Sequence, residues 1–164
     1  MRKSIFTISL AILLFVASSS CAWNGSGSHG NATDMAGVAL PQEKNTAVIE
    51  IDKAQFLEKV YDYQKNSKEW VYEGSLPCIV DFYANWCGPC RTLSSTLEKL
   101  AQEYKGKIVI YKVNVDKESE LSALFGISSI PALLWCPLGS EPFFTQGAVP
   151  EAPLREKIET SLIK

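Results

Sequence analysis

The sequence contains few of the residues on which several common functions depend. It has one histidine, His29, among its 164 residues, and 18 Asp and Glu residues outnumber 16 Lys and Arg. His29 lies in a Gly- and Ser-rich segment, where a solvated imidazole is the simplest interpretation, so we do not assign it as a catalytic base. Because no basic cluster is present, we expect neither nucleic acid nor anionic lipid as a partner.

The chain also has no apolar run of about 20 residues, the length that a membrane-spanning helix requires. Its apolar run from Ile5 to Val16 follows the basic start Met1-Arg2-Lys3 and precedes small residues. This order is typical of an export signal. We therefore predict a signal peptide at residues 1–21 and an exported protein whose compartment is the periplasm.

Two forms of the mature N-terminus remain open. Cys21 follows small residues at the end of the apolar run and resembles a bacterial lipoprotein cleavage site, where the sulfur becomes a lipid anchor. However, Ser18 stands where that pattern usually has an aliphatic residue. Ordinary cleavage near Ser20 or Ala22, which would leave a soluble protein, is the alternative.

Residues 22–45 are rich in Gly, Ser, Asn and Thr and lack helical or strand periodicity, which predicts a flexible linker. The remaining residues, 46–164, are sufficient for one domain with its own core. Apolar periodicity within them predicts strands that alternate with helices, and hence a mixed sheet flanked by helices. The expected strands are 46–51, 79–84, 108–113, 132–135 and 141–145, and the expected helices follow Asp52 and Cys87 and occupy 118–125 and 151–163.

Two cysteines three residues apart, Cys87 and Cys90, stand where a strand pattern changes into a helix pattern. The preceding residues 79–84 are β-branched and aromatic, and apolar residues then recur with helical spacing from Leu93 to Tyr104. A thiolate at a helix N-terminus is stabilised by free amide N–H groups and the helix dipole. We therefore expect the pKa of Cys87 to lie below the usual value of about 8.5.

This spacing lets the two sulfurs form a disulfide and open again with little change in the backbone. We predict that Cys87 attacks a disulfide and that Cys90 resolves the mixed disulfide. A structural disulfide is the first alternative, but so short a loop removes little entropy from the unfolded chain. A zinc site needs about four ligands, whereas the other cysteines and His29 are scattered, so we expect no metal and no cofactor.

Residues 80–91, Val-Asp-Phe-Tyr-Ala-Asn-Trp-Cys-Gly-Pro-Cys-Arg, resemble the active-site segment of the thioredoxin family. The resemblance continues, in the family's order, through residues 112–116, residues 125–127, the step Ile130-Pro131 and Gly147. The resemblance implies an α/β thioredoxin fold, with a central mixed sheet of about five strands flanked by about four helices.

The segment 63–76 is longer than its counterpart in the family. We expect Trp70 to Tyr72 to lie on the side of the domain away from the dithiol. The alternative is that they form a docking surface for a partner.

The same resemblance implies roles for two charged residues. Asp81 lies among apolar residues, and burial raises the pKa of a carboxyl group towards neutrality. By resemblance it would accept and donate the proton of Cys90, through water, whereas a solvated strand-end Asp is the alternative. Lys112 resembles the lysine near that carboxylate and would tune its pKa, unless it is simply solvated.

The resemblance also implies a substrate-binding groove. Ile130-Pro131 resembles the family's cis-proline step, at which an extended peptide would pair with the backbone of Ile130. The sequence alone would not predict a cis bond, since X–Pro bonds in folded proteins are cis only about 5–6% of the time. The residues expected around this groove are Trp86, Gly88, Pro89, Ile130, Pro131, Gly147 and Ala148.

Two further cysteines, Cys78 and Cys136, fall on strands that are antiparallel neighbours in the family fold. One hypothesis is that their sulfurs are close enough to bond, which a Cα separation above about 7 Å would exclude. The other is that they are buried free thiols acting as small apolar residues.

From these features we predict an exported thiol–disulfide oxidoreductase that reduces disulfides in envelope proteins. The resemblance implies a membrane thiol-conveying partner that recharges the dithiol, and we expect a monomer. An oxidase or isomerase is the alternative within enzymes, because an oxidising compartment would keep an isolated dithiol as a disulfide. From another class, a chaperone-like peptide-binding module with an incidental dithiol remains open.

Overall fold

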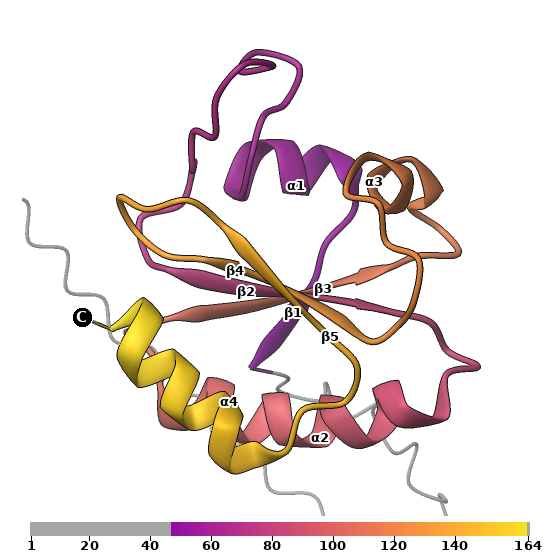
Figure 1. The fold of residues 1–164 in the computed structure, drawn as a ribbon, viewed down its shortest axis with the longest axis vertical. Coiled ribbons are helices and arrows are strands. Elements are labelled where there is room, and N and C mark those ends of the chain that lie inside the picture. Colours follow the sequence, from indigo (N-terminus) through magenta and orange to yellow (C-terminus); the bar gives the residue numbers. More distant parts are fainter. Residues whose placement is uncertain (1–46, 164) are drawn as a thin grey trace, which may run out of the picture. The chain divides into compact units, whose positions relative to one another are not determined.

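The computed structural model describes residues 47–163, so the predicted signal peptide, the linker, Cys21 and His29 lie outside the described residues. The elements follow in the predicted order, with strands and helices alternating until two successive strands precede the last helix (Figure 1). The strands are β1 (Val48–Glu50), β2 (Cys78–Tyr83), β3 (Val109–Asn114), β4 (Ala132–Cys136) and β5 (Phe143–Gln146). The helices are α1 (Lys53–Lys59), α2 (Gly88–Glu103), α3 (Ser119–Leu124) and α4 (Glu151–Lys157), which continues as the π-helical segment η1 (Ile158–Leu162).

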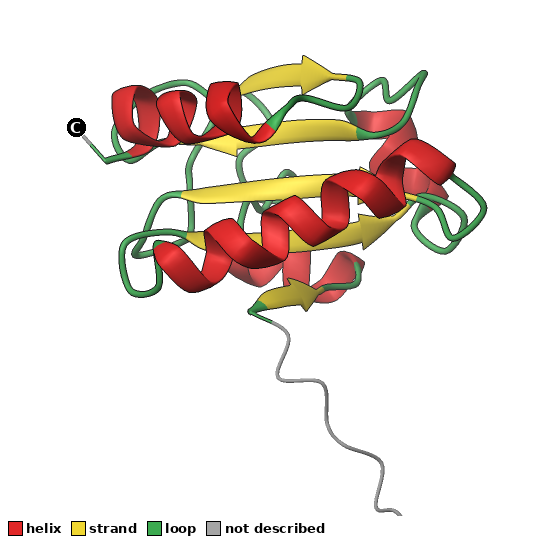
Figure 2. Ribbon diagram, turned by 90° about the horizontal axis from the view of Figure 1, so that it is seen from below, coloured by secondary structure: helices red, strands yellow, loops and turns green. Residues whose placement is uncertain are grey.

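The strands form one mixed sheet in the order β1-β3-β2-β4-β5. Strands β1, β3 and β2 are parallel, while β4 and β5 are antiparallel to their neighbours. Helices α1 and α3 cover one face of the sheet, and α2 and α4 cover the other (Figures 1 and 2). This arrangement is the thioredoxin fold, and it confirms the predicted fold class.

Each face of the sheet has its own hydrophobic core, and β2 contributes to both. Ile79 packs in the core beneath α2 and α4, whereas Val80 and Phe82 pack in the core beneath α1 and α3. Since successive side chains of a strand point to opposite faces, Asp81 lies on the α2 side. Strand β2 therefore carries a carboxyl group into the layer from which α2 begins.

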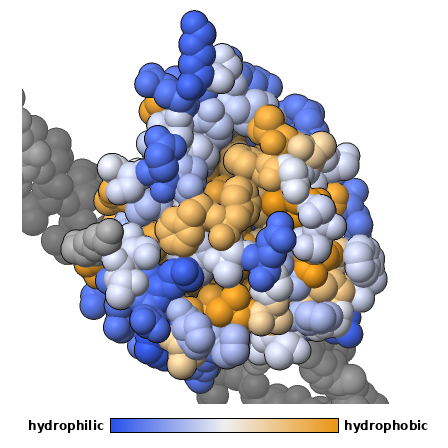
Figure 3. All heavy atoms as spheres, in the orientation of Figure 1, coloured by the Kyte–Doolittle hydropathy of each residue, from blue (hydrophilic) through white to orange (hydrophobic). Residues whose placement is uncertain are grey.

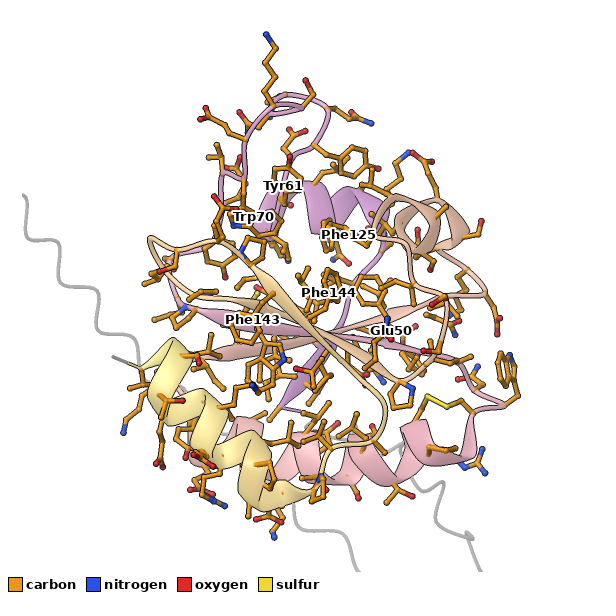
Figure 4. All side chains as sticks on the ribbon, viewed as in Figure 1. Glu50, Tyr61, Trp70, Phe125, Phe143 and Phe144 are labelled. Atoms are coloured by element: carbon orange, nitrogen blue, oxygen red, sulfur yellow. A yellow bond between two sulfur atoms is a disulfide. The ribbon has the colours of Figure 1, made fainter. Side chains whose placement is uncertain are left out.

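The residues between α1 and β2 lie at the end of the sheet opposite the start of α2, as expected. The backbone of Tyr61 forms an isolated antiparallel β-bridge with Tyr72. The centre of the Tyr61 ring lies 4.4 Å from the centre of the Trp70 ring. Figure 4 shows Tyr61 and Trp70 far from the disulfide. The segment therefore takes no part in the environment of Cys87 and Cys90.

The C-terminal helix differs from the expected single helix over 151–163. It is α-helical to Lys157 and then widens into the π-helical η1. The predicted inward residues Leu154, Ile158 and Leu162 are all buried against the sheet. Among the helices of residues 47–163, none has the length and apolar character needed to cross a bilayer.

The packing of Phe56 gives a test of the core beneath α1. Its ring is fully buried and lies edge-on to Phe125 at 5.4 Å. We expect Phe56→Ala to lower the free energy of unfolding by about 3–5 kcal/mol, because the change leaves a cavity. Urea titration measures this loss. In the matched variant Phe144→Ala, at a residue that is 41% exposed, the free energy of unfolding should fall by less than half as much. Equal costs would contradict the assignment of Phe56 to the core.

Candidate active site

Cys87 and Cys90 form a disulfide, with a Cα–Cα distance of 5.3 Å. Cys87 is the N-cap residue of α2, and Pro89 lies in the first turn of the helix. Figure 4 shows the disulfide at the start of α2, just beyond the carboxyl end of β2. The predicted pairing and the predicted strand-to-helix position are both present.

The start of α2 provides a favourable environment for negative charge on Cys87. The backbone N–H of Cys90 donates to the Cys87 sulfur at 3.2 Å, and the first turn of α2 carries no acidic residue. Free amide groups and the positive end of the dipole both stabilise a thiolate at this position. The two residues differ little in exposure, because Cys87 is 5% exposed and Cys90 is 2% exposed.

The disulfide lies against apolar side chains from three segments. Ala84 is buried beside the two cysteines, and Tyr83, Val115 and Ile130 pack against the cluster. These contacts leave both cysteines almost completely buried.

Trp86 stands beside the disulfide with 70% of its surface exposed. Its indole N–H donates to Asp116 at 3.0 Å, and the backbone N–H of Asp116 donates to the Asn114 side chain, also at 3.0 Å. The carboxylate thus orients an otherwise exposed ring. We did not predict this role for Asp116, although the residue belongs to a segment that resembles the family.

A hollow of about 320 Å³ lies beside Trp86 and Ile130. These two predicted groove residues line it, together with four residues that the sequence analysis did not assign to the site: Val115, Ile127, Ser128 and Ser129. The peptide bond between Ile130 and Pro131 is cis. Thus the structure brings the cis step, the exposed tryptophan and a hollow together at one edge of the disulfide.

The other predicted groove residues lie around this edge and not in the hollow itself. Pro131 is buried, and its carbonyl accepts the N–H of Gly147 at 2.8 Å. Gly147 has a φ of 84°, a left-handed conformation that favours glycine. Ala148 is exposed next to it, and Gly88 and Pro89 lie in the first turn of α2.

Asp81 is 2% exposed, and its Oδ1 has no hydrogen-bond partner among the described residues. Burial raises the pKa of this carboxyl group to about 7, although the positive charge of Lys112 acts in the opposite direction. Asp81 can therefore take up and release a proton near neutral pH. The expectation of a buried carboxyl is correct, and the solvated alternative is wrong.

Lys112 lies next to Asp81 in the sheet, since the two residues are partners in the register of β3 and β2. Its ammonium group is 3.7 Å from Glu50 and 5.3 Å from the centre of the Tyr83 ring. The side chain is only 25% exposed, so it is not simply a solvated lysine. The sequence analysis missed Glu50, because its proximity to Lys112 depends on strand pairing between β1 and β3.

Cys78 and Cys136 are direct partners in the antiparallel register of β2 and β4, and both are free thiols with no exposed surface. A hydrogen bond with Cys78 and burial raise the pKa of the Cys136 thiol. The sulfurs are therefore neighbours, as hypothesised. In the structure they are buried apolar thiols and do not form a bond.

The family model for thioredoxin matches residues 48–160. The chain is 45% identical over 103 residues to a thioredoxin of Borreliella burgdorferi, covering 63% of this chain and 87% of the relative. It is 35% identical to the chloroplastic M-type thioredoxin of Spinacia oleracea, covering 74% of this chain and 68% of the relative. The residues matched by the family model include the sheet, the disulfide and the cis-proline step.

A solved structure has the same fold. The crystal structure of chloroplastic thioredoxin z superposes with a TM-score of 0.56 at 30% identity, covering 68% of this chain and 91% of that chain. The sequence and structural matches therefore agree on one family.

The buried Asp81 predicts a specific pH dependence of stability. The pKa of Asp81 is raised from 3.8 to about 7, so the folded protein retains this proton over a range in which the unfolded chain loses it. The stability that the protonated group contributes is complete below pH 4 and lost as the pH rises through 7. We expect Asp81→Asn to be more stable than the parent protein by about 3–4 kcal/mol at pH 8 and nearly equal at pH 4.

Urea unfolding of the oxidised proteins at pH 4, 6 and 8 measures this difference. Glu141→Gln, at an exposed carboxylate, is the matched control. The difference in unfolding free energy between this variant and the parent protein should not increase with pH. A difference between Asp81→Asn and the parent that stays constant across the pH range would show that Asp81 does not titrate in this window.

The second cysteine pair predicts a pattern of alkylation. In the native oxidised protein, iodoacetamide should leave Cys78 and Cys136 unmodified, because both thiols are completely buried. In denaturant without a reductant, both should be modified, and Cys87 and Cys90 should not. Peptide mapping by mass spectrometry distinguishes these sites, and a cross-linked peptide joining Cys78 to Cys136 would contradict the assignment of free thiols.

Proposed function

This chain belongs to the thioredoxin family and is a protein-disulfide oxidoreductase, and we propose that it works outside the cytoplasm as a reductant of protein disulfides. The main observation behind this proposal is the position of Cys87 at the start of α2, where the Cys90 amide donates to its sulfur at 3.2 Å. An amide in that position stabilises the thiolate, which is both the attacking form and a good leaving group.

In the reduced protein, the Cys87 thiolate attacks one sulfur of a substrate disulfide. A bond forms between the Cys87 sulfur and that substrate sulfur, the substrate S–S bond breaks, and the other substrate sulfur leaves as a thiolate that takes up a proton. We assign the attack to Cys87 because it caps α2, where the helix start stabilises its thiolate, and because it is slightly more exposed than Cys90.

Cys90 then completes the reduction. Its thiol gives a proton to Asp81, through water, and the resulting thiolate attacks the Cys87 sulfur, so that the Cys87–Cys90 disulfide forms and the second substrate thiolate leaves. Two electrons have passed from the dithiol to the substrate. The pKa of Asp81, raised by burial to about 7, suits a group that accepts and returns this proton near neutral pH.

The substrate is proposed to bind as an extended peptide along Ile130, beside the cis bond to Pro131. The hollow next to Trp86 and Ile130 accommodates one of its apolar side chains. Gly88, Pro89, Gly147 and Ala148 border the same edge of the disulfide. The backbone contacts of such a strand are independent of sequence, which suits a reductant of many proteins.

The extracytoplasmic location rests on the export pattern of residues 1–21, with Cys21 as the proposed lipid anchor. In an oxidising compartment the dithiol must be recharged, and a membrane protein that conveys thiol electrons is the proposed donor. Mass measurement of the mature N-terminus distinguishes a lipid-modified Cys21 from a chain cleaved at Ser20 or Ala22.

The reduction potential tests the direction of electron flow. We expect a value near that of thioredoxin, about −270 mV, and far from the value of about −120 mV that is typical of a DsbA-type oxidant. Equilibration with defined ratios of reduced and oxidised glutathione, followed by thiol trapping, measures it. A potential near the oxidant end would assign the protein to the oxidase or isomerase branch and overturn the proposal.

Two cysteine variants test the proposed roles of the two thiols in a separate assay, the reduction of insulin. Cys87→Ser should abolish the reduction of insulin disulfides, while Cys90→Ser should accumulate a mixed disulfide between Cys87 and insulin, because no resolving thiol remains. Full biological function of Cys87→Ser in the cell would instead favour a peptide-binding module with an incidental dithiol.

A further inference from the structure

Three charged side chains form one row across the sheet. Glu50 on β1 and Asp81 on β2 are both register partners of Lys112 on β3, which lies between them. Directly paired residues of neighbouring strands project to the same face of a sheet. The Lys112 ammonium therefore has a carboxyl group available on either side.

Lys112 pairs with only one of these groups in the described part of the chain. Its Nζ lies 3.7 Å from Oε2 of Glu50, whereas no ion pair of the described residues joins it to Asp81. The Oδ1 of Asp81 has no hydrogen-bond partner there either. The ammonium is also 5.3 Å from the centre of the Tyr83 ring, on the same face of β2 as Asp81.

The two carboxyl groups differ in exposure, which explains this preference. The Glu50 side chain is 42% exposed and so keeps part of its hydration, whereas Asp81 is almost completely buried. Burial alone would raise the pKa of Glu50, but hydrogen bonds with Lys117 and Tyr83 and the charge of Lys112 outweigh it, so the pKa is lowered. Glu50 is therefore ionised throughout the range in which Asp81 titrates.

We propose that Glu50 is a positioning residue that holds the Lys112 ammonium at the outer edge of the sheet, away from Asp81, and so preserves the ability of Asp81 to exchange a proton near neutral pH. The consequence of this arrangement for Cys90 rests on the proposed reduction of substrate disulfides. The effect of Glu50 on Asp81 does not depend on that proposal. Figure 4 shows Glu50 at the end of the sheet where α2 begins.

Among the described residues, the other side chains around this contact come from four segments. From β2 the neighbouring titratable group is Tyr83, and from α2 it is the Cys87–Cys90 pair, whose sulfurs are bonded in the structure. The partner of Asp81 on β4 is Leu133, which carries no charge. Lys117 reaches Glu50 at 3.2 Å, but its side chain is largely exposed.

Glu50→Gln tests the proposal by releasing Lys112. The ammonium is then free to approach the Asp81 carboxylate, and we expect the pKa of Asp81 to fall by about half a unit or more. Lys112→Gln should have the opposite effect, because it removes the positive charge that counteracts burial. The side-chain carbon resonance of Asp81, followed by NMR across the pH range in the oxidised protein, reports both changes directly.

The double variant distinguishes an effect through Lys112 from a direct effect of the Glu50 charge. If Glu50 acts by positioning Lys112, the double variant Glu50→Gln/Lys112→Gln should titrate like Lys112→Gln alone, since no ammonium is left to be positioned. An Asp81 pKa in the double variant well below that of Lys112→Gln would overturn the proposal. So would an unchanged Asp81 pKa in Glu50→Gln.

Glu118→Gln is the matched control. It makes the same change in net charge at a nearby carboxylate that forms no ion pair with the described residues, and it should leave the Asp81 titration unchanged. The rate of insulin reduction by the reduced protein should also be measured against pH. The midpoint on the acid side of this profile should lie at lower pH in Glu50→Gln, by the same amount as the fall in the Asp81 pKa. Because the NMR titration needs no substrate, it decides on Glu50 even if the reduction potential overturns the proposed direction of electron flow.

Discussion

Burial of β2 on both faces is the constraint on which the chemistry of this protein depends. The strand lies between β3 and β4, and helices cover both faces of the sheet. A central strand in such a sheet is normally apolar throughout, and Asp81 is the exception here. Because Asp81 is almost completely buried, the cost of ionising its carboxyl group raises the pKa of that group to about 7.

The same strand determines where the disulfide lies. Beyond Tyr83 the chain leaves the carboxyl end of β2 and enters α2, so the first amides of the helix surround Cys87. The face of the domain seen in Figure 3 carries apolar side chains over β5. Phe144 of β5 contributes to them, packed 6.0 Å from the Phe125 ring.

Local sequence patterns were sufficient to predict the central elements and the two cysteines. The β-branched run before Cys87 and the helical spacing of leucines after it define β2 and α2, because each pattern arises within one element. The contacts of Glu50 with Lys112 and of Trp86 with Asp116 were not predictable, since they depend on strand register and on side-chain conformations across distant segments. The lining of the hollow was missed for a similar reason, because residues 127–129 form a loop without periodicity.

The direct pairing of Cys78 with Cys136 has a consequence for the reactivity of the domain's thiols. These thiols come from strands that lie more than fifty positions apart in the sequence, and they become inaccessible when β4 docks beside β2. In the folded domain this strand pair therefore keeps two of the four cysteines out of thiol exchange, and only the pair at the start of α2 is left to react with other thiols.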